Sequence, residues 1–306
     1  RDAEDLKALF DEAKISKRGL VAAKDRRTVI KERVVADRQQ VVRVDYETQG
    51  PIADSTRKQV LARYAALLKT VDVVILEDYA KGLLTREMTE RVFALARNRK
   101  IPVIVDPNAR TPLNWYRGAE LLTPNTREAQ ALAGFRITDL ASLSAAARTI
   151  LSASGARTLI LTRGKEGMAI FQRGKQEAYL IPTFAREVFD VSGAGDTVIA
   201  VLGLALASGA SIAEAATLAN IAAGVEVGKR GTATVTIPIV TPSVMLVLDK
   251  SGSMVADPSG YWDHDADDAD GDGIKDGDPQ MTPATPPITR WSSLYTVVDF
   301  IVTSFN

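Results

Sequence analysis

The sequence predicts an α/β protein in which a parallel β-sheet is covered by helices on both faces. Between residues 55 and 235, short and nearly continuous apolar runs alternate with stretches of helical periodicity. Parallel strands buried on both faces give such runs, and the intervening helices provide the crossover connections. Residues 28–47 differ, because apolar and polar residues alternate there, which predicts a small antiparallel β flap with one wet face.

The first elements can be placed from their periodicity. Residues 1–14 form a charged segment of helical character. Asp54 or Ser55 can cap the next helix, which is followed directly by a buried strand at residues 71–76. The apolar residues that share one face of this helix are Val60, Leu61, Tyr64, Leu67 and Leu68.

Further strands and helices follow in the same alternation. Thr85 can cap a second helix, and residues 103–105 and 159–161 form two more short apolar strands. The apolar residues of the second helix are Met88, Val92, Phe93 and Leu95. The longest apolar stretch, residues 198–207, is helix-like and shorter than the ~18 residues that a membrane span needs, so no membrane span is expected.

A change of composition predicts a boundary near Pro238 and Pro242, which divides the chain into residues 1–238 and 239–306. Beyond it, residues 243–248 form one apolar strand, residues 256–287 an acidic insertion rich in Gly and Pro, and residues 292–305 a helix-like segment. This second part is too small to enclose a core of its own. We therefore expect it to be a fragment or to pack against something else.

Composition excludes several classes of site. The 306 residues contain 38 Lys and Arg, 38 Asp and Glu, one His and no Cys. A disulfide scaffold, a thiolate zinc site and a Cys nucleophile are therefore ruled out. The zero net charge argues against a generally basic nucleic-acid binder, so no nucleic-acid partner is expected. The zero net charge conceals an asymmetry, because residues 241–306 carry a net charge of −8 and the remaining residues a net charge of +8.

The most informative segment is DVSGAGDT at residues 190–197. Small residues at Gly193, Ala194 and Gly195 allow a tight turn at a helix start, where backbone N–H groups and the helix dipole favour an anion. Asp196 beside them can accept a proton from an attacking hydroxyl. The local pattern alone also fits a Gly-rich turn in which Asp196 only caps the helix.

DVSGAGDT resembles the C-terminal signature of the ribokinase-like PfkB carbohydrate kinases. Residues 125–128 (NTRE) match that family's N-x-x-E motif, and residues 162–167 (TRGKEG) its T-x-G-x-x-G nucleotide loop. The resemblance implies a ribokinase-like, Rossmann-like sheet flanked by helices. A narrower resemblance, to the heptose 7-phosphate kinases that often form half of a bifunctional ADP-heptose synthesis enzyme, rests on residues 28–47, EDYAKG at 77–82, VDPN at 105–108, WYRGAELLTPN at 115–125 and VGKRGTATV at 227–235.

The resemblance implies an ATP-dependent kinase that phosphorylates the anomeric hydroxyl of a heptose 7-phosphate. The product, heptose 1,7-bisphosphate, would serve ADP-heptose and lipopolysaccharide core synthesis, so the kinase part is expected in the cytoplasm. Asp196 would be the general base, and the N–H groups of Gly193, Ala194 and Gly195 would stabilise charge on the transferred phosphoryl group.

The same resemblance implies a nucleotide site with Mg²⁺. Asn125 and Glu128 would hold the Mg²⁺-bound phosphates, Glu128 through water. The other residues expected at the ATP are Thr126, Arg127, Thr162, Gly164, Gly167, Asn220 and Lys229. Asn125 and Glu128 also fit a plain helix cap with an acid in the first turn, and the sequence leaves both interpretations open.

Residues near predicted strand ends are candidates for the sugar pocket. Asp78, Lys81 and Asp106 follow strand carboxyl ends, where open α/β sheets bind ligands, although ordinary loop residues would look the same. Candidates in the flap for the sugar or its 7-phosphate are Lys31, Arg33 and Gln40, and the alternative is a solvated face. By analogy with the family, the flap also indicates a homodimer.

The sequence departs from the family in its opening portion. The family's Gly-Gly signature and several sugar-binding residues do not occur in this chain, so we expect the sheet to lack its first strands. A chain of this kind can hold the catalytic Asp and still be inactive. No cytidylyltransferase motif H-x-G-H follows, and the single His is His264 in the acidic insertion.

The acidic part carries two further candidate metal sites. Residues 244–254 (VMLVLDKSGSM) resemble the start of a von Willebrand factor A domain, an α/β fold of which only a part would be present and which would suit an extracellular setting. Its metal ligands would be Asp249, Ser251 and Ser253. The acidic residues Asp268, Asp270, Asp272 and Asp276 have the spacing of a Ca²⁺ loop without its bidentate Glu, and a solvated linker is the alternative.

Three hypotheses follow for the whole chain. The first is a sugar kinase with an adventitious tail, and it leads because its motifs cover most of the sequence. The second is a metal-dependent adhesion or protein-binding module, and the third a fusion of truncated fragments without activity.

Overall fold

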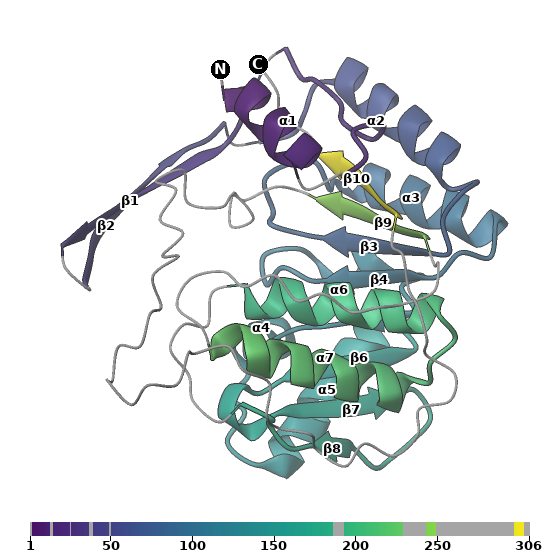
Figure 1. The fold of residues 1–306 in the computed structure, drawn as a ribbon. Helices are drawn as coiled ribbons and strands as arrows, with labels where there is room; N and C mark the ends of the chain where they lie inside the picture. Colours follow the sequence, from purple (N-terminus) through teal and green to yellow (C-terminus); the bar gives the residue numbers. More distant parts are fainter. Residues whose placement is uncertain are drawn as a thin grey trace, which may run out of the picture.

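The computed structural model describes residues 2–12, 15–24, 26–36, 39–48, 50–185, 193–228, 243–248 and 297–302. Within them an eight-stranded sheet lies between two layers of helices (Figure 1). Its strands are β3 (Val73–Glu77), β4 (Val103–Asp106), β5 (Leu121–Leu122), β6 (Thr158–Thr162), β7 (Met168–Gln172), β8 (Tyr179–Ile181), β9 (Ser243–Leu248) and β10 (Val297–Val302).

The sheet is mostly parallel, as predicted. Its strand order is β10-β9-β3-β4-β5-β6-β7-β8, and the strands from β10 to β6 run parallel, whereas β7 and β8 are antiparallel to their neighbours. The helices are α1 (Asp2–Glu12), α2 (Asp54–Leu67), α3 (Arg86–Asn98), α4 (Thr126–Ala133), α5 (Leu140–Ser154), α6 (Ala194–Ala207) and α7 (Ile212–Val227), with 3₁₀ turns η1 (Leu113–Tyr116) and η2 (Gly164–Glu166). None of the helices in the described ranges is long and apolar enough to cross a membrane.

Side chains that alternate along β3 divide the core into two layers. Val74 and Leu76 belong to the layer covered by α2, α3 and α5, and Val73 and Ile75 to the layer covered by α1, α6 and α7. Gly203 allows α6 to pack closely on the sheet, because a Cβ there would lie 2.9 Å from Cδ1 of Ile75.

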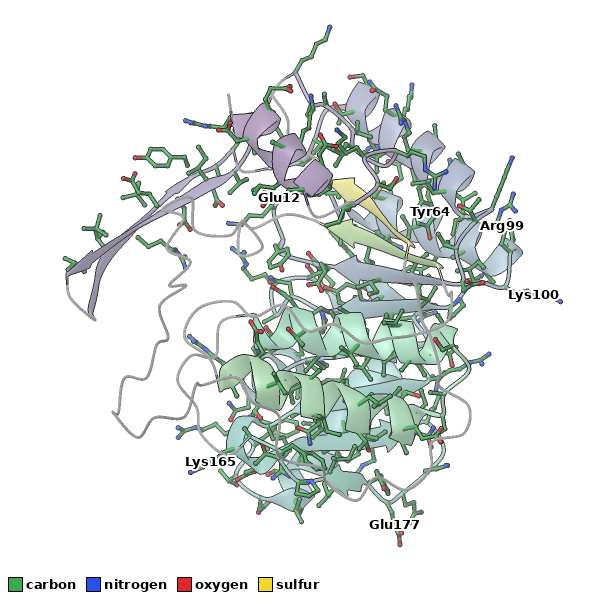
Figure 2. All side chains as sticks on the ribbon, in the orientation of Figure 1. Glu12, Tyr64, Arg99, Lys100, Lys165 and Glu177 are labelled. Carbon is green, nitrogen blue, oxygen red and sulfur yellow. The ribbon has the colours of Figure 1, made fainter. Side chains whose placement is uncertain are left out.

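Helices α2 and α3 are joined by a buried hydrogen bond. The Tyr64 hydroxyl donates to the Val92 carbonyl oxygen at 3.2 Å, and Tyr64 is fully buried between the helices (Figure 2). Thr85 caps α3 as predicted, since its side chain accepts from the Met88 N–H. The predicted cap of α2 is wrong, because the helix begins one residue earlier: Ala53 is its N-cap and makes no side-chain cap bond.

The predicted flap is confirmed as a two-stranded antiparallel ribbon that extends away from the sheet (Figure 1). It consists of β1 (Ile30–Ala36) and β2 (Gln39–Tyr46). In its register Val34 pairs with Val42 and Glu32 with Val44, so these side chains share one face. The valines of this face and Tyr46 are exposed. The side chains of Lys31, Arg33 and Gln40 lie outside the described part of the chain.

The strand predicted at residues 243–248 is confirmed, but the helix predicted over residues 292–305 is wrong where the structure describes it. Residues 297–302 form β10, which pairs parallel with β9. The run VVDFIV is rich in β-branched and aromatic residues, which favour a strand, and a short apolar run does not distinguish the two structures by periodicity. Strand β9 pairs with β3, so the acidic part adds two strands to the sheet of the first part.

Candidate active site

Four sequence motifs meet at one edge of the sheet. Strands β3, β4, β5 and β6 are parallel neighbours, so their carboxyl ends lie together. The segments EDYAKG, VDPN, NTRE and TRGKEG continue from these four ends in that order. Helix α6 begins at the same edge, because Asp196 in its first turn accepts a hydrogen bond from the Tyr79 hydroxyl at 3.2 Å. Such an edge is where α/β sheets bind ligands.

The start of α6 has the geometry of an anion site. Gly193 is the N-cap with φ +80°, a conformation that favours glycine. The first N–H groups of the helix, among them those of Ala194 and Gly195, have no partner within the helix. A Cβ added at Gly195 would meet no atom within 4 Å, so a ligand can approach this backbone closely. Residues 190–192 of the motif lie outside the described residues.

Carboxyl groups from the ends of β3 and β4 and from the first turns of α4 and α6 are concentrated at this edge of the sheet. Burial, reinforced by the charges of Asp106 and Asp196, raises the pKa of Glu77 well above its usual value. Burial, followed by the charge of Glu128, raises the pKa of Asp106 to about 8, although the Thr123 hydroxyl donates to it at 3.0 Å. Neighbouring carboxyl groups whose pKa values are raised by burial and by one another's charge are typical of a functional site.

The N-x-x-E segment forms a reciprocal helix cap at the start of α4. The Asn125 side chain accepts from the Glu128 N–H and the Glu128 carboxylate from the Asn125 N–H, both at 2.9 Å. Burial raises the pKa of Glu128, and the bonds from Asn125 oppose that shift. The structure therefore confirms the helix cap, and the nucleotide role of Asn125 and Glu128 stays a prediction. Arg127 is exposed beside them.

The loop after β6 lies directly against this cap. The backbone of Thr162 pairs with that of Asn125, and the Thr126 hydroxyl donates to the Thr162 carbonyl at 3.3 Å. Two glycines in the loop differ in their surroundings. A Cβ at Gly167 would lie 2.0 Å from the Ile181 carbonyl oxygen, whereas one at Gly164 would meet nothing within 4 Å. Gly167 thus permits close packing against β8, and Gly164 faces open space. Lys165 between them is exposed (Figure 2).

Asn220 is buried in α7 and links that helix by a hydrogen bond to the segment after β8. Its side-chain amide donates to the Pro182 carbonyl oxygen at 2.6 Å. Its predicted place near the adenine remains a prediction. The predicted residues that lie outside the described part of the chain are Lys229, Asp249, Ser251, Ser253, Asp268, Asp270, Asp272 and Asp276.

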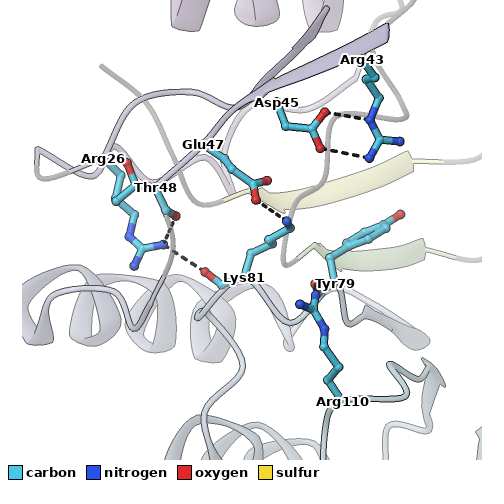
Figure 3. Close-up of polar contacts among 8 residues, drawn as sticks. All are labelled: Arg26, Arg43, Asp45, Glu47, Thr48, Tyr79, Lys81 and Arg110. Carbon is cyan, nitrogen blue, oxygen red and sulfur yellow. Dashed lines mark hydrogen bonds and ion pairs between the residues drawn. The ribbon is translucent and has the colours of Figure 1, made fainter. Parts of the chain in front are cut away.

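The loop after β3 is held by its own charged residues. The Asp78 carboxylate accepts from the Ala80 N–H at 2.7 Å and from the Tyr116 hydroxyl at 2.5 Å, and Asp78 is buried. Lys81 pairs with Glu47 at the base of the flap, at 2.5 Å (Figure 3). Asp78 and Lys81, two of the three strand-end residues predicted to line the sugar pocket, are therefore engaged within the chain at the edge of the site.

Arg26 joins the base of the flap to the same loop. Its guanidinium donates to the carbonyl oxygens of Thr48 at 3.3 Å and Lys81 at 3.1 Å (Figure 3). It also donates to the carbonyl oxygen of Gly50. Sequence reasoning missed Arg26, Glu47 and Tyr79. Tyr79 lies inside the EDYAKG segment between two residues that were selected, but no local pattern indicates its contact with Asp196.

The described residues fit Mg²⁺ bound together with a phosphate, rather than in a cage of protein side chains. In the described part of the chain no group of three or more acidic, His or Cys side chains is placed to hold a metal ion. Mg²⁺ is usually held by one or two carboxylates, water and substrate phosphates. Glu128 is a carboxylate suited to that arrangement.

The fold and site define an α/β enzyme of the carbohydrate kinase class. The model of the pfkB family of carbohydrate kinases matches residues 2–239, and the chain belongs to that family. The bifunctional protein HldE of Geobacter metallireducens is 48% identical over 217 residues, which are 71% of this chain and 44% of that protein. The HldE of Geobacter sulfurreducens is 47% identical over the same shares. The chain thus spans less than half the length of these relatives.

Solved structures show the same fold. Ribokinase from Giardia lamblia superposes with a TM-score of 0.59 at 20% identity, covering 76% of this chain and 75% of that one. The tetrameric inhibited form of phosphofructokinase-2 from Escherichia coli superposes with a TM-score of 0.59 at 19% identity, covering 73% of each chain. The ribokinase-like fold predicted from the sequence motifs is confirmed.

Proposed function

We propose that this chain transfers the γ-phosphoryl group of ATP to the anomeric hydroxyl of a heptose 7-phosphate. The observation that carries the proposal is the start of α6, where Asp196 lies beside N–H groups that have no partner within the helix and an open backbone at Gly195. The heptose is supported by the matched segments of the sequence and by the relatives named HldE.

In this mechanism Asp196 removes the proton of the anomeric hydroxyl as its oxygen bonds to the γ-phosphorus. The bond between that phosphorus and the β–γ bridging oxygen breaks, and ADP leaves. The N–H groups of Ala194 and Gly195 stabilise the charge on the transferred group, which is the main catalytic task in phosphoryl transfer. Asn125 and Glu128 orient the phosphates, and Mg²⁺ bound there neutralises phosphate charge.

The exposed apolar face of the flap supports a homodimer as a further part of the proposal. Val34, Val42, Val44 and Tyr46 lie on one face of a ribbon that extends from the body (Figure 1). A second copy that packs on this face would bury it.

The test is ADP formation by the chain in the presence of heptose 7-phosphate, compared with ribose and fructose 6-phosphate. We expect Asp196→Asn to lower kcat by about 10²- to 10⁴-fold, the usual contribution of a general base. Asp139→Asn is the matched control, because Asp139 is an exposed cap of α5 and Asn is an equally good cap. No ADP formation with heptose 7-phosphate, faster ADP formation with ribose or fructose 6-phosphate, or full activity in Asp196→Asn would overturn the proposal.

A further inference from the structure

We propose that Tyr79 is a positioning residue that orients the catalytic carboxylate of Asp196 through its hydroxyl group. The inference rests on the proposed function, since it takes Asp196 to be the base. Tyr79 follows β3 and Asp196 lies in the first turn of α6, and the Tyr79 hydroxyl donates to Asp196 Oδ1 at 3.2 Å. Such contacts are often long in an unliganded site and shorten when substrate binds.

The backbone that carries Tyr79 is fixed on both sides. Asn108 donates its side-chain amide to the Asp78 carbonyl at 3.2 Å, and Arg110 donates to the Tyr79 carbonyl at 3.3 Å (Figure 3). Ala80 has φ +53°, a left-handed conformation that is costly for alanine. Its N–H is held by the Asp78 carboxylate, as described above. The strained Ala80 backbone and these three hydrogen bonds thus stabilise one conformation of the loop, the one that directs Tyr79 at Asp196.

A second carboxyl group, that of Glu77 at the end of β3, is buried, and a side-chain hydrogen bond with Tyr79 opposes the rise that burial gives its pKa. Its Oε2 is buried and has no hydrogen-bond partner among the described residues.

We expect the bond from Tyr79 to hold Asp196 in one rotamer. Asp196 Oδ1 accepts from Tyr79, and in the proposed reaction the carboxylate faces the sugar hydroxyl. Positioning of this kind contributes to the transition state rather than to ground-state binding, because the base must lie on the line of proton transfer. Loss of the tyrosine hydroxyl should therefore appear in kcat and not in KM.

The experiment replaces Tyr79 with Phe, which removes only the hydroxyl of a half-buried ring. We expect kcat to fall about 10- to 100-fold, the range for a hydrogen bond to a charged group, with KM for both substrates within about twofold. The control is Tyr64→Phe, which removes a buried hydroxyl bonded to the Val92 carbonyl between α2 and α3 and should leave kcat unchanged. The double variant Tyr79→Phe/Asp196→Asn should be as slow as Asp196→Asn alone.

The outcomes separate this inference from the proposed function. If Asp196→Asn loses turnover while Tyr79→Phe keeps full kcat, Tyr79 has no positioning role and the proposed function stands. If Asp196→Asn stays active, both are wrong. A readout without turnover is the ¹³C carboxyl resonance of Asp196, assigned by its loss in Asp196→Asn. It should move in Tyr79→Phe and not in Tyr64→Phe, and an unchanged resonance would overturn the contact even in an inactive chain.

Discussion

Replacing the two glycines of the loop after β6 should separate folding from nucleotide binding. Gly167 has φ +80° and ψ −129°, and its added Cβ would lie 2.0 Å from the Ile181 carbonyl oxygen and 2.6 Å from the Pro182 carbonyl carbon. Alanine in that backbone conformation costs about 1–3 kcal/mol, and moving the backbone after β8 costs a similar amount. We expect Gly167→Ala to lower the free energy of unfolding by about 4 kcal/mol.

Replacing Gly164 with Ala should weaken ATP binding and change the stability of the fold little. Its φ of +57° makes alanine unfavourable by about 1 kcal/mol, but its Cβ would meet no atom within 4 Å of the chain itself. The open space is where the proposed function places the nucleotide. The added methyl group should therefore collide with ATP and weaken its binding by about tenfold or more, which is a loss of about 1.4 kcal/mol.

Urea denaturation measures the first effect and calorimetric titration with MgATP the second. Gly134→Ala is the control, because Gly134 ends α4 with φ +82° and also has no atom within 4 Å of its Cβ. It should cost about 1 kcal/mol of stability without changing ATP affinity. Equal destabilisation by Gly164→Ala and Gly167→Ala would refute the packing argument, and unchanged ATP affinity in Gly164→Ala would refute the nucleotide position.

Three further predictions concern other parts of the molecule. Burial raises the pKa of Asp106 from 3.8 to about 8, so between pH 4 and 8 the folded protein holds a proton that the unfolded chain has released, and its free energy of unfolding should fall as the pH rises. Urea denaturation at several pH values should show a weaker fall for Asp106→Asn. An identical slope in the two proteins would contradict this prediction. Strand β9 pairs with strands on both sides, so Leu246→Pro should lower the free energy of unfolding by about 3 kcal/mol or more, measured by urea denaturation. Val297→Pro, at the first residue of β10, should lower it little. Equal losses in the two variants would show that β9 is not part of the sheet. On the flap, Val42→Lys should shift a dimer to monomer in analytical ultracentrifugation, and an unaltered sedimentation profile would argue against this interface.

The sequence alone was sufficient for the α/β class, because the period of apolar residues reports directly which face of an element is buried. It also predicted the Thr85 cap and the helix that follows Gly193, since these depend on a few adjacent residues. It failed at residues 297–302, where six residues are too few to show a helical or a strand period. The pairing of β9 with β3 was not predictable, because the pattern of a strand does not specify its neighbours.

For the candidate site, the motifs predicted the residue types and the edge of the sheet, but not their contacts. Asn125 and Glu128 fit a cap and a phosphate site equally well in one dimension, and the structure shows the cap. Asp78 and Lys81 were expected at the sugar, and the structure shows the partners that hold their charges within the chain. Side chains of the same type serve either purpose, so only their surroundings distinguish them.

The sequence by itself therefore determined the kind of fold and the family, through local periodicity and short motifs. Only the tertiary structure decided that Tyr79 reaches Asp196, 117 residues further along the chain, and that Asp106 lies half-buried near other carboxyl groups. The physical reason is that contacts between distant residues depend on strand order, register and helix placement together. A pKa depends on the water and charges around a group, and these are set by the whole fold and not by the neighbours in sequence.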